Sequence, residues 1–166
     1  MSTLHEVRAM EAVVEVQIDA PRETVWDALT SRATDWWHRD FYTGRAPQGF
    51  VFEARLGGRV YEDWGEGEGA VWYTVVALRR GESLSLAGTV ACGATGLETI
   101  FDTITLADGR GGTLLRMQSR ALGVLSDDFG TQTEEGWKLL FGSCLKNFVE
   151  KDERPERPPS LTRRPS

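Results

Sequence analysis

Short strand-like segments alternate with glycine-rich turns through the middle of the chain. The turns LGG, GEGEG, RRG, ACGATG and ADGRGG separate segments that are rich in β-branched and aromatic residues. Connections this brief place consecutive strands side by side, so the pattern predicts an antiparallel meander. The predicted strands are GFVFEA, GRVYEDW, AVWYTVVAL, ESLSLAG, LETIFDTITL and GTLLRMQSRAL.

The segment AVVEVQI, at residues 12–18, adds a seventh strand before the meander. The sequence APRETVWDAL, at residues 20–29, then predicts a short helix. Pro21 suits the first helical turn, because its missing N–H group costs no hydrogen bond there. Trp26 lies at the flank of the apolar face of this helix. We expect it to pack in the core rather than to contact a ligand.

A second helical pattern occurs in TQTEEGWKLLFGSCLKNFVEK, at residues 131–151. Thr131 and Glu134 have the spacing of a capping box, which predicts the start of the helix. The apolar residues that follow recur at helical spacing and form one stripe, which we expect to face the sheet. These residues are Trp137, Leu140, Phe141, Cys144, Leu145 and Phe148.

Charge and composition limit the domain and its partners. The chain has 25 acidic and 19 basic residues, and its net charge of -6 would repel a nucleic-acid backbone. We find no secretion signal and no apolar run of about 20 residues, so we expect a cytoplasmic protein that binds neither nucleic acid nor a membrane. Residues 1–10 are expected to form an N-terminal arm and residues 11–151 one domain. Residues 152–166, rich in proline and arginine, predict a disordered tail.

Few residues offer metal or covalent chemistry. Cys92 and Cys144 lack CxxC spacing, and His5 and His38 lack metal-ligand spacing, so we predict free thiols and no metal site. No nucleophilic-serine motif or phosphate-binding loop stands in the required context. The sequence therefore predicts no cofactor and no catalytic residue, and an enzyme is the less favoured interpretation.

Four landmarks in chain order resemble a known family. They read APRETVWDAL, LGGRVYEDW, GAVWYTVV and EEGWKLLFGSCL. Together they resemble the START-like (SRPBCC, birch-pollen-allergen-like) superfamily, and within it the group named for the activator of the heat-shock-protein-90 ATPase. The resemblance covers residues 11–151, whereas residues 41–50 match no landmark of the group. It implies an α+β helix-grip fold, a seven-stranded curved antiparallel sheet with two short helices and a long C-terminal helix packed over it.

A helix-grip fold implies a cavity, because a strongly curved sheet and a straight helix cannot touch along their whole length. Such a space suits a small hydrophobic or amphipathic molecule, although an aromatic stripe at helical spacing is also typical of a filled core. Helical spacing and strand alternation select eight candidate ligand-binding residues. They are Trp137, Leu140, Phe141 and Leu145 from the helix, and Leu84, Leu86, Leu115 and Met117 from the strands.

Two acidic residues within predicted strands are candidate polar anchors for a ligand. Glu62 and Asp102 each share a strand face with apolar neighbours two positions away. Burial would raise the pKa of either carboxyl group and suit it to act as an acid, a base or an anchor. The opposite face of the second strand, with Leu97, Thr99 and Phe101, could equally point inward. An Asp102 that lies in water is the favoured interpretation.

Three functions from different classes are consistent with these observations. Binding of a small hydrophobic or amphipathic ligand is favoured, since the implied cavity is the feature with a definite physical use. The name of the group suggests a chaperone-linked interaction module as the second. The superfamily implies a cyclase or hydratase type of enzyme as the third, which requires Glu62 or Asp102 to face the cavity. Candidate partners besides the ligand are a chaperone and a second copy of the chain.

Overall fold

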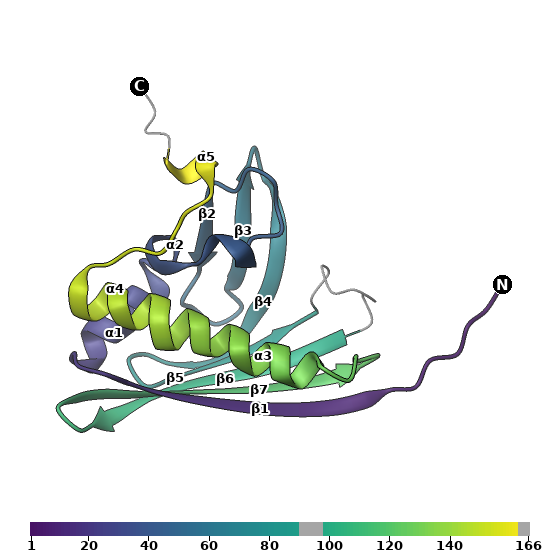
Figure 1. Ribbon diagram of the computed structural model, residues 1–166, viewed down its shortest axis with the longest axis horizontal. Helices are drawn as coiled ribbons and strands as arrows, with labels where there is room; N and C mark the ends of the chain where they lie inside the picture. Colours follow the sequence, from purple (N-terminus) through teal and green to yellow (C-terminus); the bar gives the residue numbers. More distant parts are fainter. Residues whose placement is uncertain (90–97, 163–166) are drawn as a thin grey trace.

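The structure, a computed structural model, describes residues 1–89 and 98–162. Within these residues a seven-stranded antiparallel sheet has the order β1-β7-β6-β5-β4-β3-β2, so β1 and β2 are its edges (Figure 1). The order from β2 to β7 is the predicted meander, and the α+β helix-grip fold is confirmed. The strands are β1 (Arg8–Ile18), β2 (Gly49–Phe52), β3 (Arg59–Gly65), β4 (Glu68–Arg79), β5 (Ser83–Gly88), β6 (Glu98–Gly109) and β7 (Gly112–Gly123).

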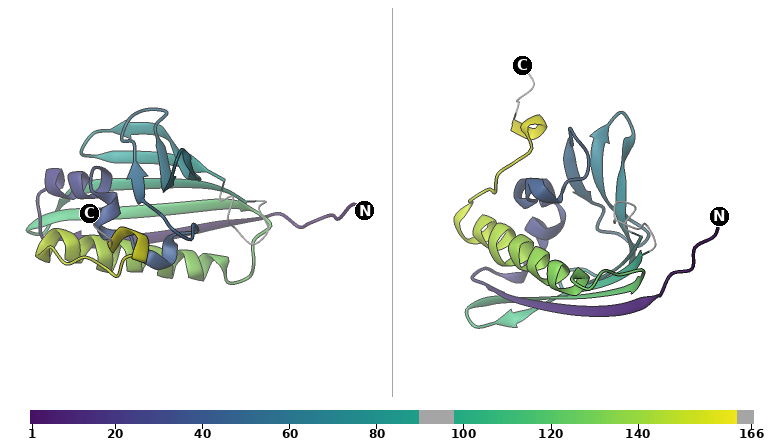
Figure 2. Two further views of the ribbon diagram at one scale, coloured as in Figure 1. Left: turned by 90° about the horizontal axis from the view of Figure 1, so that it is seen from above. Right: turned by 45° about the vertical axis from the view of Figure 1, so that its right-hand side comes forward.

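One long helix crosses the concave side of the curved sheet, as two further views show (Figure 2). It runs without a break through α3, a π-helical segment η2, and α4. Its buried side chains face the sheet, as the apolar stripe predicts. The three parts are α3 (Phe129–Trp137), η2 (Lys138–Leu145) and α4 (Lys146–Lys151).

The start of this helix differs from the prediction. Asp128 is the N-cap residue, and its carbonyl oxygen accepts a hydrogen bond from the backbone N–H of Gln132 at 2.9 Å. The first helical turn therefore forms before Thr131, which lies inside the helix. The predicted capping box of Thr131 and Glu134 is wrong.

Short helices close one end of the sheet. They are α1 (Arg22–Thr30), α2 (Ala33–Trp36) and the 3₁₀ turn η1 (Arg39–Phe41). Trp26 of α1 is buried, and the indole N–H of Trp36 donates a hydrogen bond of 2.7 Å to the carbonyl oxygen of Ala28. These contacts join α1 to α2 beside the end of the C-terminal helix.

The core lies between the concave face of the sheet and the helices. Strand alternation places every second side chain on that face, and in the ladder Ile104 lies opposite Met117 with both side chains buried. Leu84, Leu115 and Leu145 are fully enclosed. The predicted inward face of β7 and of the helix is thus the observed core face.

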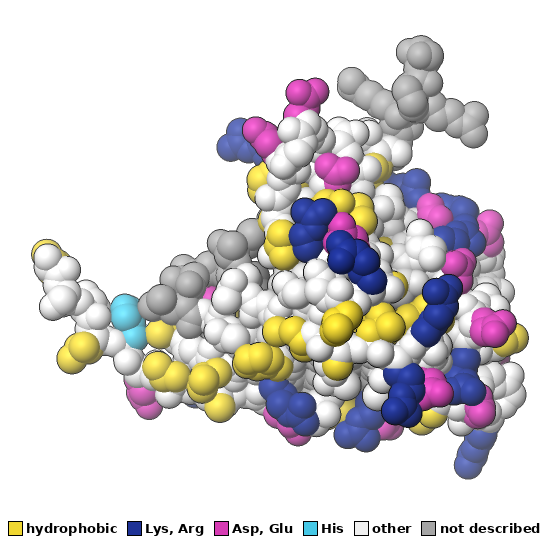
Figure 3. All heavy atoms as spheres, turned by 180° about the vertical axis from the view of Figure 1, so that it is seen from behind, with side chains coloured by type: hydrophobic (Ala, Val, Ile, Leu, Met, Phe, Trp, Pro, Cys, Tyr) yellow, Lys and Arg dark blue, Asp and Glu magenta, His cyan; other side chains and the backbone are white. Residues whose placement is uncertain are grey.

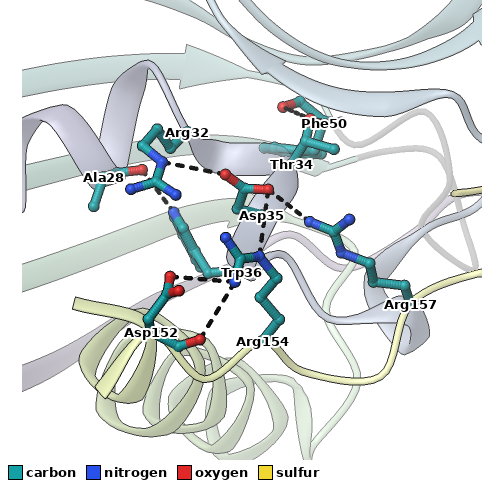
Figure 4. A network of polar contacts seen from close by, with 9 residues as sticks. All are labelled: Ala28, Arg32, Thr34, Asp35, Trp36, Phe50, Asp152, Arg154 and Arg157. Carbon is teal, nitrogen blue, oxygen red and sulfur yellow. Dashed lines mark hydrogen bonds and ion pairs between the residues drawn. The ribbon is translucent and has the colours of Figure 1, made fainter. Parts of the chain in front are cut away.

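Residues 152–162 pack against α2 and the following loop, although the sequence predicts a disordered tail from residue 152. Three arginines converge on the carboxylate of Asp35, namely Arg32, Arg154 and Arg157 (Figure 4). The shortest of these ion pairs, to Arg157, measures 2.6 Å. Charge pairing with a residue far away in the chain supplies the contacts that the polar composition of this segment does not reveal. The segment ends in α5 (Pro159–Thr162), where the Ser160 hydroxyl donates to the carbonyl oxygen of Pro47 at 2.6 Å.

The N-terminal residues extend away from the body of the molecule (Figure 1). Strand β1 begins at Arg8, which pairs with Gly123, so residues 8–10 of the predicted arm belong to the sheet. On the face seen in Figure 3, basic and acidic side chains are intermingled rather than gathered by sign. None of the helices in the described ranges is both long and apolar enough to cross a bilayer.

Candidate functional site

A cavity of about 140 Å³ lies between the sheet and the C-terminal helix. Its floor consists of buried side chains from three strands, Tyr73 of β4, Ile100 of β6 and Ser119 of β7. Trp137 and Leu140 of the C-terminal helix form the opposite wall. No charged residue is among those that line this cavity, so its surface is apolar apart from a few hydroxyl and amide groups.

The mouth of the cavity lies between η1 and α3. Half-exposed Phe41 and Thr133 and exposed Gln132 line this side. A Cβ atom at Gly136 would lie 3.2 Å from Cε1 of Phe41. The absence of a side chain at Gly136 therefore allows the helix and the Phe41 ring to approach closely at the mouth.

A β-bulge brings Trp72 into the cavity wall. Val60 pairs with Tyr73 and Tyr61 pairs with Val71, which leaves Trp72 as an extra residue in β4. Bulges change the direction of side chains locally. As a result Trp72 and Tyr73, which are consecutive in sequence, both line the cavity, whereas strict alternation would direct one of them outward.

Glu62 is fully buried and connects several elements near the cavity through hydrogen bonds. Its carboxylate oxygens accept hydrogen bonds from the backbone N–H groups of Thr43 and Gly44 and from the Thr43 hydroxyl. The indole N–H groups of Trp64 and Trp72 also donate to it, at 2.9 and 3.0 Å. Glu62 therefore ties the loop after η1, and with it the cavity residue Trp72, to strand β3.

Asp102 lies beside the floor of the cavity and has no such donors. Its exposed fraction is 1%, and neither carboxyl oxygen has a hydrogen-bond partner among the described residues. Burial raises the pKa of Asp102 from its ordinary value of 3.8 to about 6. The neighbouring hydroxyls of Ser119 and Tyr73 are close enough to oppose this rise in pKa, but neither has hydrogen-bond geometry to the carboxyl group. Burial and the charge of Asp102 in turn raise the pKa of Tyr73.

The orientation of β6 corrects the interpretation favoured from the sequence. Asp102 faces the core, whereas Phe101, on the opposite face, is 49% exposed. The prediction that Asp102 lies in water is therefore wrong. Burial of Ile100 and Ile104 on the same face outweighs the cost of burying one carboxyl group. Leu97, the third residue of the alternative face, lies outside the described residues.

A second, apolar void of about 20 Å³ lies next to the cavity, deeper in the core. Trp137 and Tyr73 line both spaces and so form the partition between them. The Trp137 ring stacks on Phe141 with centroids 5.1 Å apart. The void has room for about one water molecule and offers it almost no polar partner, so we expect it to be dry.

The predicted ligand-binding residues divide into three groups. Two of them line the cavity, and one of these two, Trp137, also lines the small void; three more line the small void alone, and three are enclosed in the core without lining either space. In this order they are Trp137 and Leu140; Leu86, Met117 and Phe141; and Leu84, Leu115 and Leu145.

Several cavity residues were missed from the sequence. Ser119 continues the alternation that selects Leu115 and Met117, so the same signal could have found it. Phe41 lies in a segment without periodicity, and no sequence pattern indicates the bulge at Trp72.

Other chemical groups are few. Within residues 1–89 and 98–162, no three His, Cys, Asp or Glu side chains are grouped so as to hold a metal ion. Cys144 is a free, buried thiol, and burial raises its pKa to about 11. Cys92 lies outside the described residues.

Comparison with known proteins relates this geometry to a family. A family model described as "Activator of Hsp90 ATPase homolog 1-like protein" matches residues 19–150. No curated protein matches the sequence.

Solved structures of other proteins share the fold. A putative uncharacterized protein from Rhizobium leguminosarum is similar with a TM-score of 0.70 at 18% identity, over 90% of this chain and 99% of that one. Protein MLL2253 from Mesorhizobium loti has a TM-score of 0.63 at 23% identity, over 86% and 98% of the two chains. DynU16, described as a putative protein in the dynemicin biosynthetic locus, has a TM-score of 0.61 at 19% identity, over 87% and 48%. At these identities the likeness is one of fold alone.

Proposed function

The chain belongs to the family of Activator of Hsp90 ATPase homolog 1-like proteins, and we propose that this member binds a small, largely apolar molecule between its sheet and its C-terminal helix. The observation that carries the proposal is the cavity of about 140 Å³ with an aromatic wall and a mouth at η1. Binding pockets of this kind are typically concave and apolar, with few polar groups.

The volume of the cavity limits the size of the ligand. Apolar cavities of about 150 Å³ hold a molecule such as benzene, whereas drug-sized ligands occupy about 300–1,000 Å³. A cavity of about 140 Å³ therefore fits one ring or an aliphatic group of similar size. A longer lipid-like chain would require the helix to move away from the sheet.

Toluene titrations followed by nuclear magnetic resonance test the proposal directly. We expect saturable shifts at residues around the cavity, such as Ile100 and Leu140. Thr133→Trp places a large side chain at the mouth from a half-exposed position and should abolish these shifts. Glu135→Trp adds the same side chain to the same helix at an exposed position outside the cavity, and should leave them unchanged. Toluene that fails to saturate the unmodified protein, or that binds Thr133→Trp equally well, would contradict the proposal.

One observation favours a second candidate function, an enzyme. A buried carboxyl group with a pKa of about 6 can exchange a proton near neutral pH, as a general acid or base must. If Asp102 has this role, a ligand that co-purifies with the protein is converted on incubation to a product of different mass. Asp102→Asn would then retain the ligand unconverted, and mass spectrometry of the released ligand distinguishes the two outcomes.

The chaperone-linked function remains a prediction from the family name. A pulldown with the middle domain of a chaperone of the heat-shock-protein-90 type tests it independently of ligand binding. We assign no contact surface for such a partner, and cytoplasmic location likewise remains a prediction.

A further inference from the structure

The buried carboxyl groups of Glu62 and Asp102 differ in how their hydrogen-bonding capacity is satisfied. Glu62 accepts hydrogen bonds from five donor groups of the protein, so its burial is compensated within the chain. Asp102 is nearly as inaccessible, yet neither of its oxygens accepts a hydrogen bond from any side chain or backbone group of residues 1–89 and 98–162. A buried polar group without a partner is costly and rare in native proteins, and each case calls for an explanation.

The surroundings of Asp102 point toward the cavity. Across the ladder it lies opposite Ser119 on one side and Leu86 on the other. The hydroxyl-bearing residues next to it, Ser119 and Tyr73, both line the cavity. Asp102 does not itself line the cavity, but it neighbours two residues that do.

We infer that the molecule bound in this cavity carries a hydrogen-bond donor, a hydroxyl or an amino group, which the hydroxyls of Tyr73 and Ser119 accept at the floor with the neighbouring carboxyl group of Asp102 behind them. The inference rests on the proposed ligand-binding function and specifies the class of ligand. A carboxylate accepts hydrogen bonds only, whereas each hydroxyl can donate to Asp102 and accept from the ligand at the same time. The rest of the molecule is a single ring or a group of similar size, because the remaining wall is aromatic and aliphatic.

The lining of the cavity supports a donor rather than an acidic ligand. Among the described residues no basic side chain lines the cavity, so an anionic ligand would meet a buried carboxyl group without a compensating charge. A neutral hydroxyl and a protonated amine both fit the acceptor. The aromatic rings of Trp72 and Trp137 in the wall would additionally favour a cation that reaches a ring face.

Ligands that are almost the same size test the inference. Toluene, phenol and aniline differ only in a methyl, hydroxyl or amino group on the same ring, and calorimetry or nuclear magnetic resonance gives a dissociation constant for each. The measured quantity is the ratio of the toluene constant to the phenol or aniline constant, compared between protein variants. Differences in the hydration of the free ligands cancel in this comparison, because they are the same for every variant.

Asp102→Leu removes the carboxyl group while keeping the same number of side-chain heavy atoms in the same branched arrangement. We expect it to lower the ratio at least about tenfold, through weaker binding of phenol and aniline and unchanged or tighter binding of toluene. Ser119→Ala removes one hydroxyl of the floor and should lower the ratio about threefold or more. It is a smaller change and serves as the test if Asp102→Leu does not fold. Asp27→Asn, at an exposed aspartate of α1, is the matched control and should leave the ratio unchanged.

The outcomes separate the two proposals. Suppose that toluene, phenol and aniline all bind, and that the ratio is the same in Asp102→Leu as in the unmodified protein. The cavity then binds ligands but does not recognise the donor. The inference is then overturned. Ser119→Ala gives the same test if Asp102→Leu does not fold. If none of the three ligands binds the unmodified protein, the ligand-binding function itself fails. A benzylamine arm distinguishes a preference for a cationic donor from a preference for a neutral one.

Discussion

Replacing Asp102 with asparagine should stabilise the protein at neutral and alkaline pH. The carboxyl group is buried without a hydrogen-bond partner, and burial raises its pKa from 3.8 to about 6. Each pKa unit corresponds to about 1.4 kcal/mol, so the ionised group costs the folded state about 3 kcal/mol relative to the unfolded chain. Asparagine has nearly the same shape and carries no charge, so it avoids this cost.

The sign of the pH dependence follows from the raised pKa. The folded state holds the proton more tightly than the unfolded chain does, so the stability associated with this proton is fully present below about pH 3.8. It is lost as the pH rises through about 6. The difference in the free energy of unfolding between Asp102→Asn and the unmodified protein should therefore be small near pH 4 and reach about 3 kcal/mol by about pH 8.

Denaturant unfolding followed by tryptophan fluorescence measures this difference across the pH range. Subtracting the two curves matters, because Glu53 and Asp128 have lowered pKa values and change the stability of both proteins with the opposite sign. Asp27→Asn, an exposed aspartate, serves as the control and should show no rising difference. A difference that is independent of pH, or an Asp102→Asn protein that is less stable at pH 8, would refute the conclusion that Asp102 is unsatisfied.

Three further changes test other parts of the structure. Glu62→Gln should lower the free energy of unfolding by about 3 kcal/mol, because the NH₂ group of glutamine would face N–H donors that now bond to a carboxylate oxygen. Denaturant unfolding measures this loss, and a loss under about 1 kcal/mol would contradict the prediction. Asp35→Asn should weaken its ion pairs with Arg154 and Arg157 and speed hydrogen exchange at the amide of Leu161, with a cost to global stability of about 1 kcal/mol or less. Unchanged exchange at that amide would mean that these charges do not hold the segment. Cys144 should react with iodoacetamide at pH 8 only as fast as the protein opens, because the thiol is buried and its pKa is raised to about 11. Peptide mapping gives the rate of labelling, and rapid labelling of the folded protein would contradict a buried thiol.

The alternation of β7 illustrates what a local pattern can predict. Leu115 and Met117 are buried as their period of two requires, and the same period continues to Ser119 on the cavity floor. The apolar stripe of the C-terminal helix likewise faces the sheet, even though the helix begins at Phe129 and not at the predicted capping box of Thr131. In each case the signal is carried by neighbouring residues in one element.

The β-bulge at Trp72 illustrates what a local pattern cannot predict. Its position depends on the pairing of Val60 and Tyr61 with β4, which the sequence of β4 alone does not specify. The tail is a similar case. The polar composition of residues 152–162 predicts disorder, and the contacts that hold it come from Asp35, far away in the chain.

The sequence alone thus determined the strands, the order of β2 to β7 and the apolar face of the long helix, because turn chemistry and side-chain period act over a few residues. Only the tertiary structure decided whether the two candidate anchors, Glu62 and Asp102, find hydrogen-bond donors. Whether a buried carboxyl group is satisfied depends on donors that come from other elements. For Glu62 these donors are gathered from the loop after η1 and from β3 and β4. Asp102 accepts no hydrogen bond from the described residues, and this difference is the basis for the ligand proposed at the cavity floor.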